Sequence, residues 1–282
     1  MPVTPRVLLD GLCFPEGPRW HQERLWFSDM HAQEVIALDL EGKAEVVHRV
    51  PEDPSGLGWL PDGRLLVVSM RDRRLLREDA GGLVEHADLS PFATWHCNDM
   101  VVDERGRAYV GNFGSELDPE AGAPRPADLV VVEPDGAARV AARELAFPNG
   151  SVILPDGETL VVGETFAGRL TAFTIASDGG LGDRRVWAEL PGKTPDGVCL
   201  DAENAIWVTS PMTGEVLRVR EGGEVAATLR PERAPFACML GGPEGRTLFL
   251  CTARSFDPGE TRVQRAGRIE VLEVDVPGAG RP

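Results

Sequence analysis

Short apolar runs separated by turn residues recur along the whole chain, and one pattern of them occurs six times. Each copy has a lead residue, an apolar run, a turn and a second apolar run, as in Ser55-Gly-Leu-Gly-Trp-Leu-Pro-Asp-Gly followed by Leu65-Leu-Val-Val-Ser. The lead residues are Glu16, Ser55, Asn98, Asn149, Asp196 and Ala237. They follow one another at about 40 to 50 residues, which is typical of one propeller blade.

The turn position supports interpreting each copy as a β-hairpin. Five copies have a glycine or an asparagine eight residues after the lead, where a tight turn needs a positive φ. These residues are Gly63, Gly106, Gly157, Asn204 and Gly245. The first copy has Arg24 at this position, so we expect a different turn there.

Two further strands after each hairpin give a four-stranded antiparallel sheet, so the sequence predicts an all-β, six-bladed propeller. The segment Arg6-Val-Leu-Leu has no unit of its own, and we expect it to complete the sixth blade beside Arg268-Ile-Glu-Val-Leu-Glu-Val-Asp. This arrangement closes the ring and removes exposed sheet edges. Residues 1–282 then form a single domain. A β-sandwich or an open solenoid would not explain six matched units.

Composition and charge narrow the range of partners. The net charge of −16 argues against binding to nucleic acid, because such proteins need a basic face. No apolar stretch approaches the ~18 residues of a membrane span, and residues 1–11 lack the apolar core of a signal peptide. The five cysteines form no CxxC pair, which indicates reduced thiols. We therefore expect a cytoplasmic protein that contacts neither nucleic acid nor membrane.

Rotational equivalence would bring the six lead residues together at one mouth of the central channel. Two carboxylates and two amides pointed at one another are unfavourable unless a cation lies between them. An oxygen-only donor set favours Ca²⁺ or Mg²⁺, and zinc or manganese stays open. The alternative is that these polar side chains bind only channel water and neighbouring turns.

Four phrases carry a resemblance that covers essentially the whole chain. They are Phe14-Pro-Glu-Gly-Pro, Asn98-Asp-Met-Val-Val-Asp, Phe147-Pro-Asn-Gly and Thr194-Pro-Asp-Gly-Val. With them the sequence resembles the family of gluconolactonase, regucalcin (senescence marker protein 30) and luciferin-regenerating enzyme. The resemblance implies a six-bladed propeller that binds one divalent metal ion, with Ca²⁺ favoured, and hydrolyses a small lactone or ester.

The resemblance also implies roles for particular residues. It maps the metal ligands onto Glu16, Asn149 and Asp196, and it makes Asp196 the general base as well. Asn98 matches a position that contacts the substrate or metal-bound water. Glu116 matches a further substrate-contacting position.

One position departs from the family pattern. His96 stands where sugar-lactone members carry an arginine, and it is flanked by Trp95 and Cys97. An arginine offers a planar fork of donors to sugar hydroxyls, whereas histidine is shorter and can be neutral. The departure puts a simple aldonolactone in doubt, and a more apolar lactone or ester would suit Trp95.

The sequence is also compatible with other functions. The chain could be a non-catalytic metal-binding scaffold or regulator, because a fold does not imply a function. The same site could also serve phosphotriester hydrolysis, or a hydration or dehydration. Insertions at residues 115–128 and 253–267 fit either a lid over the channel or a solvated loop.

Overall fold

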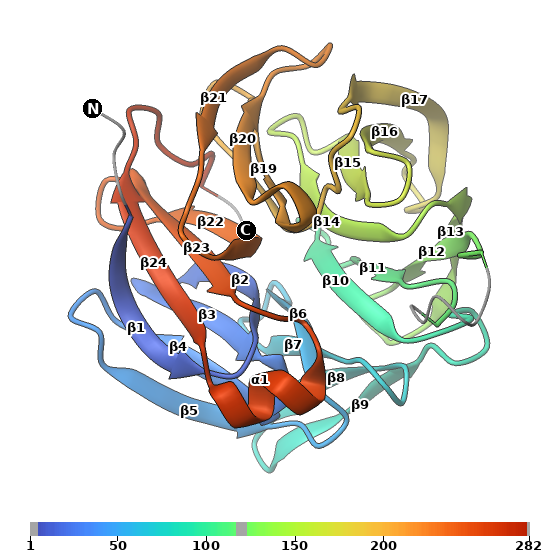
Figure 1. Cartoon of the computed structure of the whole chain (residues 1–282). Coiled ribbons are helices and arrows are strands. Elements are labelled where there is room, and N and C mark those ends of the chain that lie inside the picture. The colour runs from blue at the N-terminus through green and yellow to red at the C-terminus, as the bar shows by residue number, and fades with distance from the viewer. Residues whose placement is uncertain (1–4, 117–122, 281–282) are drawn as a thin grey trace.

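The computed structural model describes residues 5–116 and 123–280, and these residues form six four-stranded antiparallel sheets around a central axis (Figure 1). The first three blades are β2 (Pro15–His21) to β5 (Ala44–Arg49), β6 (Pro54–Trp59) to β9 (Gly82–Asp88), and β10 (Cys97–Val102) to β13 (Ala138–Leu145). The two middle strands are β3 (Arg24–Asp29) and β4 (Glu34–Leu38) in the first blade, β7 (Leu65–Ser69) and β8 (Arg74–Asp79) in the second, and β11 (Ala108–Asn112) and β12 (Ala127–Val132) in the third.

The next two blades have the same order from the innermost strand outward. They are β14 (Pro148–Ile153), β15 (Thr159–Glu164), β16 (Arg169–Ile175) and β17 (Leu181–Glu189), then β18 (Val198–Leu200), β19 (Ile206–Ser210), β20 (Glu215–Val219) and β21 (Val225–Leu229). The prediction of a six-bladed propeller is therefore confirmed.

The sixth blade joins both ends of the described chain. It contains β22 (Ala234–Gly241), β23 (Thr247–Ala253), β24 (Gly267–Glu273) and, outermost, β1 (Arg6–Leu12). Arg6 lies opposite Val271 in an antiparallel ladder. The predicted closure is confirmed, and it pairs an edge of β24 that would otherwise be exposed.

The innermost hairpins turn as their sequences predict. Gly63, Gly106, Gly157, Asn204 and Gly245 all have positive φ. In the first blade, Gln22 and Glu23 have φ of 49° and 60° between β2 and β3. Positive φ at both positions of a two-residue loop is the geometry of a type I′ turn. The first hairpin thus turns differently from the others, as expected.

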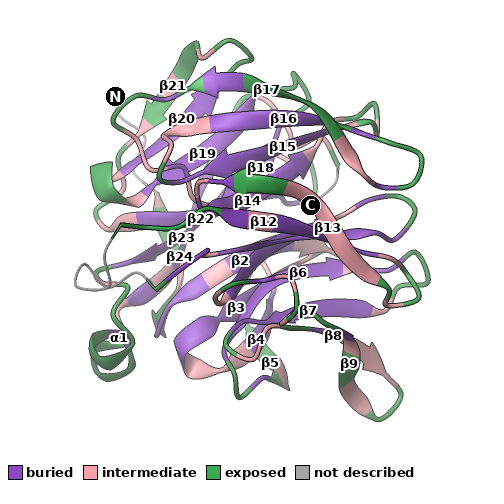
Figure 2. Ribbon diagram, turned by 90° about the vertical axis from the view of Figure 1, so that its right-hand side faces the viewer, coloured by how far each residue is buried: buried purple, intermediate pink, exposed green. Residues whose placement is uncertain are grey.

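Apolar side chains from adjacent blades pack against each other around the ring. Leu66 and Val68 of the second blade share one buried cluster with Met100, Val110 and Val130 of the third. The inner and middle strands are buried on both faces, whereas exposed residues concentrate in turns and outermost strands (Figure 2). No helix among the described residues has the length and apolarity needed to cross a bilayer.

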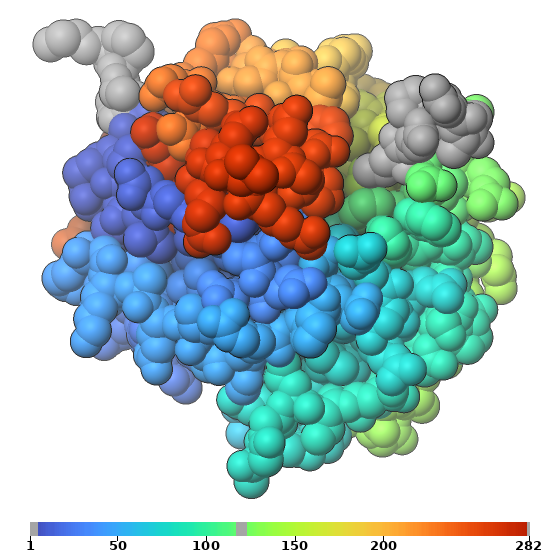
Figure 3. Space-filling model, turned by 60° about the horizontal axis from the view of Figure 1, so that its bottom comes forward, coloured from blue at the N-terminus to red at the C-terminus, as the bar shows by residue number. Residues whose placement is uncertain are grey.

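The insertion in the last blade contains a short helix, α1 (Pro258–Gln264). Asp257 caps it by accepting a hydrogen bond of 2.9 Å from the backbone N–H of Glu260. The helix packs against η1 (Met30–Ala32) of the first blade, and Thr261 Oγ1 lies 2.7 Å from His31 Nδ1. Figure 3 shows atoms of this red segment against the blue first blade. The insertion therefore packs against the first blade, and it is not merely a solvated loop.

The other insertion is shorter than expected at its C-terminal end. Strand β12 begins at Ala127, so Asp128 already belongs to the sheet. Residues 117–122 lie outside the described residues, and the lid hypothesis for 115–128 stays a prediction.

The contact between His31 and α1 predicts a pH dependence of stability. Burial lowers the pKa of His31 from 6.5 to about 4, and its ring also stacks on Phe14 at 4.8 Å. Below pH 6.5 the unfolded chain takes up a proton that folded His31 does not, so stability falls as pH drops toward 4. We expect the His31 contribution to cost about 2 kcal/mol between pH 7 and pH 5. Urea unfolding at both pH values measures it.

The control for this prediction is His31→Phe, which keeps an aromatic ring beside Phe14 but cannot be protonated. The difference in unfolding free energy between pH 7 and pH 5 should be smaller in this variant than in the wild type by that amount. Equal pH dependence in both proteins would show that His31 is not the titrating group.

Candidate functional site

Glycines next to the lead residues hold neighbouring blades close together at the channel. A Cβ on Gly150 would lie 2.6 Å from the backbone oxygen of Asp196, and one on Gly197 would lie 2.5 Å from Cα of Ala237. Gly17 stands in the same relation to Ser55, at 2.7 Å from its backbone oxygen. Real Cβ atoms do not approach backbone this closely. The absence of a side chain after the lead thus allows consecutive lead residues to meet.

The structure brings the polar lead residues together. Ser55 Oγ lies 3.4 Å from Asn98 Oδ1, and the amide of Asn149 donates a hydrogen bond to the carboxylate of Asp196. Glu16 accepts a hydrogen bond of 3.0 Å from the backbone N–H of Gly17. Glu16 and Asp196 are half-buried, whereas Asn98 and Asn149 are buried. The two carboxylates therefore reach solvent at a mouth walled by amides.

The electrostatics of this mouth are unfavourable in the absence of a cation. Burial raises the pKa of Glu16 well above its ordinary value, and the nearby charge of Asp196 raises it further. Burial likewise raises the pKa of Asp196, the hydrogen bond from Asn149 opposes this, and the charge of Asp99 adds to it. Negative charge near each carboxyl group thus disfavours its ionisation.

The donor set fits a hard divalent cation. Glu16, Asn149 and Asp196 would supply carboxylate and amide oxygens, which Ca²⁺ and Mg²⁺ prefer. A cation there would favour the ionised form of both carboxyl groups and so offset the burial and negative charge that raise their pKa values. No group of three or more His, Cys, Asp or Glu side chains suited to a metal occurs in the described residues, which agrees with a set that contains only two carboxylates.

Asn98 carries an unused donor beside this set. Its Nδ2 is buried and has no hydrogen-bond partner within the protein. A buried N–H without a partner is unfavourable, so such groups commonly bind water or a ligand. Asn98 is therefore equipped to donate to an oxygen that enters the channel.

Sequence reasoning missed a buried ion pair below the lead residues. Arg19 of β2 reaches past the second blade to β10, where its Nη2 lies 2.7 Å from Asp99 Oδ1. The side chains are 5% and 9% exposed. The repeat contained a signal for this pair. Asp99 directly follows the lead residue Asn98, whereas glycine follows four of the other lead residues. The two members of the pair act on Glu16 in opposite directions, since the charge of Asp99 raises the pKa of Glu16 and the charge of Arg19 lowers it.

The remaining two predicted substrate positions differ in their surroundings. His96 is half-buried and stacks on Trp95 with ring centroids 4.9 Å apart. Burial and then the charge of Arg71 lower its pKa, which keeps the ring neutral at neutral pH. Glu116 is exposed beside residues 117–122, which the structure does not describe, and its role stays a prediction.

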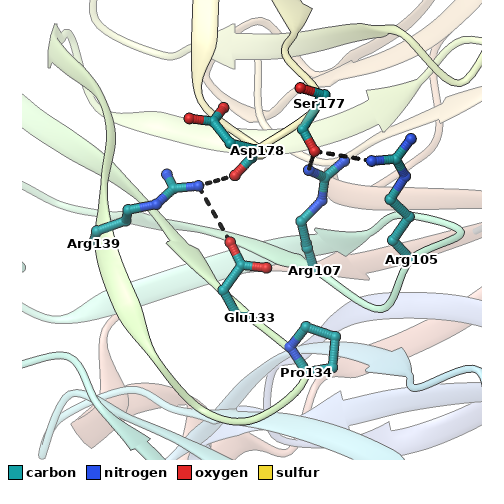
Figure 4. Close-up of a pocket in the computed structure, with 7 residues that line it drawn as sticks. All are labelled: Arg105, Arg107, Glu133, Pro134, Arg139, Ser177 and Asp178. Atoms are coloured by element: carbon teal, nitrogen blue, oxygen red, sulfur yellow. Dashed lines mark hydrogen bonds and ion pairs between the residues drawn. The ribbon is translucent and has the colours of Figure 1, made fainter.

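A pocket lies at the end of the third and fourth blades that is opposite to the lead residues (Figure 4). It has a volume of about 540 Å³ and is lined by Arg105, Arg107, Arg139 and four further residues. Arg105 and Arg107 each donate to the backbone oxygen of Ser177, and Arg139 pairs with Glu133 at 3.2 Å. Because these guanidinium groups already have protein partners, we place the candidate site at the other mouth.

Comparison with known proteins agrees with this placement. Residues 14–254 match the family model of the SMP-30/gluconolactonase/LRE-like region. The chain belongs to this family. The matched segment contains every lead residue, so the family pattern spans all the polar groups at the mouth.

Relatives of the chain include lactonases. The 6-deoxy-6-sulfogluconolactonase of Pseudomonas putida is 26% identical over 277 residues, which cover 95% of this chain and 93% of that protein. The lactonase drp35 of Staphylococcus saprophyticus is 26% identical over 240 residues, or 80% of this chain and 70% of that protein. Relatives of this kind support lactone hydrolysis as an activity of the family.

Solved structures show the same architecture. The calcium-binding protein regucalcin from Agrobacterium tumefaciens superposes with a TM-score of 0.82 at 25% identity, covering 100% of this chain and 97% of that one. A gluconolactonase from Xanthomonas campestris gives a TM-score of 0.76 at 24% identity, over 96% and 89% of the two chains. The second likeness supports the fold.

Proposed function

We propose that the protein is a metal-dependent hydrolase of lactones. The observation that carries this proposal is the meeting of Glu16, Asn149 and Asp196 at a solvent-reaching mouth, where burial and neighbouring negative charge raise both carboxyl pKa values. The membership of lactonases in the same family supports it.

Glu16, Asn149 and Asp196 would hold the metal ion, and Ca²⁺ is the favoured ion. When bound, such an ion polarises an ester carbonyl and makes a nearby water more acidic. The protein would need no Ser or Cys nucleophile, because a lactone is an activated cyclic ester.

Asp196 would act as the general base, and Asn98 would act as a hydrogen-bond donor. Asp196 would accept a proton from the attacking water, whose oxygen bonds to the carbonyl carbon. The ring C–O bond then breaks, and the proton goes to the departing alkoxide to give the hydroxy acid. The free N–H of Asn98 would donate to an oxygen of the substrate or of the attacking water.

The test is hydrolysis of a lactone panel by chelator-treated protein, with and without added Ca²⁺, Mg²⁺, Mn²⁺ or Zn²⁺. The panel contains δ-gluconolactone and aliphatic γ- and δ-lactones. We expect chelation to abolish turnover and at least one ion to restore it, because the two carboxylates and the amide need the cation. Turnover that survives complete metal removal would contradict metal dependence.

Binding measurements separate this proposal from a role in metal binding alone. Calorimetric titration of the chelated protein with each ion gives its affinity. Tight binding of an ion together with no hydrolysis of any lactone would overturn the hydrolase proposal and favour a non-catalytic calcium-binding role.

A further inference from the structure

Five aromatic side chains of the third and fourth blades form a continuous strip. Neighbouring ring centroids lie 4.9 Å apart for Trp95 and His96, 6.0 Å for His96 and Phe113, 4.7 Å for Phe113 and Phe147, and 5.1 Å for Phe147 and Phe166. We call these residues the aromatic strip. Aromatic rings at such distances stabilise one another and present a broad apolar face.

The aromatic strip begins at the candidate site. His96 stands two residues before Asn98, and Phe147 stands two residues before Asn149. The backbone N–H of Phe113 donates to the oxygen of His96 at 3.0 Å, which ties the end of β11 to the start of β10. The strip therefore extends outward from the amides that line the mouth.

The strip is accessible along most of its length. Trp95, His96 and Phe113 are half-buried, and Phe166 is 47% exposed. Only Phe147 is buried, between Phe113 and Phe166. Three half-buried rings and one exposed ring thus leave the strip open to contact with a small molecule.

Four of the nine exposed large apolar residues of the described chain lie at the same end of the propeller as the lead residues. Five are valines on outermost strands: Val7, Val46, Val84, Val186 and Val225. The other four lie in connections that follow the second strand of a blade: Phe166, Met212, Phe256 and Val263. Because the second strand runs antiparallel to the first, these connections lie at the end where the lead residues are. Apolar groups collected around polar ones are typical of a binding site for a small molecule.

The backbone conformation of Phe147 is a further indication that the strip is a binding surface. Its φ is +60°, a left-handed conformation that is unusual for a bulky residue. The equivalent residue before Ser55 is Asp53, with φ of +62°, and Asp adopts this conformation readily. A phenylalanine in this conformation costs free energy, and the packing of Phe147 in the strip offsets that cost.

We propose that the aromatic strip binds the apolar substituent of a lactone whose ring is opened at the lead residues. The substrates are then lactones that carry an alkyl or aryl group. Sugar lactones are poor substrates, because their hydroxyl groups would lose water against phenyl rings and gain no hydrogen bonds. This inference rests on the proposed hydrolase function and specifies its substrate class.

The experiment compares three δ-lactones with the metal-loaded protein. δ-Valerolactone is the bare ring, δ-decalactone adds a pentyl group, and δ-gluconolactone adds hydroxyl groups. We expect kcat/KM for δ-decalactone to exceed that for δ-valerolactone about tenfold or more, since several methylene groups leave water. We expect δ-gluconolactone to be the poorest of the three. No gain from the pentyl group, or a preference for δ-gluconolactone, overturns the inference.

Variants test whether the strip causes the preference. Phe166→Ser should lower the ratio of kcat/KM for δ-decalactone to that for δ-valerolactone about threefold. Val186→Thr is the matched control, because Val186 is 45% exposed but lies on the outer strand β17, and it should leave the ratio unchanged. His96→Arg introduces a guanidinium and should shift the preference toward δ-gluconolactone. Equal ratios in the wild type and Phe166→Ser would contradict a role of the strip.

The outcomes distinguish a failure of the proposed substrate class from a failure of the proposed hydrolase function. Hydrolysis of δ-valerolactone without any gain from the pentyl group would refute the substrate class and leave the hydrolase standing. Failure to hydrolyse any of the three lactones with any metal ion would refute the hydrolase, and the substrate class with it.

Discussion

Replacing Asp196 by asparagine should lower kcat/KM for any lactone substrate by a factor of about 10³ or more, because it removes a general base and a metal ligand together. Asparagine has nearly the same shape, so the packing against Gly150 and the hydrogen bond with Asn149 can persist. Asp196→Ala should be equally inactive. Steady-state kinetics at saturating metal ion measure the loss.

Two readouts distinguish catalysis from damage to the fold. Metal-free Asp196→Asn should be more stable than the metal-free wild type by about 1–2 kcal/mol, since it removes one of two carboxylates that burial disfavours. Glu16→Gln removes a charge from the same mouth and should weaken metal binding, while kcat at saturating metal stays within about tenfold. An Asp196→Asn protein with wild-type kcat would disprove the assignment of the base.

Replacing Arg19 by methionine should lower the free energy of unfolding by about 3–5 kcal/mol, because it leaves the charge of Asp99 buried and unpaired. Arg19→Met/Asp99→Asn should recover much of the loss, since neither charge then remains. Guanidinium unfolding of the wild type, the two single variants and the double variant gives the coupling energy. A loss in the double variant equal to the sum of the single losses would show that the pair is not coupled.

Arg107 provides the matched control for Arg19. It pairs with Asp103 at 2.6 Å, with side chains 6% and 5% exposed, and lies at the opposite end of the third blade. Arg107→Met should be destabilising to a similar degree but should leave metal affinity unchanged. Arg19→Met should tighten metal binding about threefold or more, because Arg19 is a positive charge close to Glu16.

The sequence predicts the fold well where one residue type satisfies a local requirement. Gly63 and Asn204 mark hairpin turns because positive φ is costly for most residues. The segment beginning at Arg6 could be assigned to the sixth blade because it had no hairpin of its own. The helix α1 was missed although Asp257 and Pro258 form a start signal, because seven residues are too few to show helical periodicity.

The candidate site could be predicted only in part, because only some of its contacts follow the repeat. Glu16, Asn149 and Asp196 share a register in the repeat, so rotation predicts that they meet. The contact between Arg19 and Asp99 joins the first blade to the third and follows no register. The rings of Phe113 and Phe147 come from different blades, and their contact depends on how these blades are placed around the propeller axis.

The closure by β1 also affects when the protein can fold. Its partner strand, β24, lies far later in the sequence, so the ladder between Arg6 and Val271 forms only after the ribosome has made Val271. Until then the sixth blade lacks its outermost strand, and β1 is a strand without a partner. Contacts between residues so far apart slow folding. Newly made chains should therefore depend on protection from association during synthesis, and they become a closed ring only once β24 has been made.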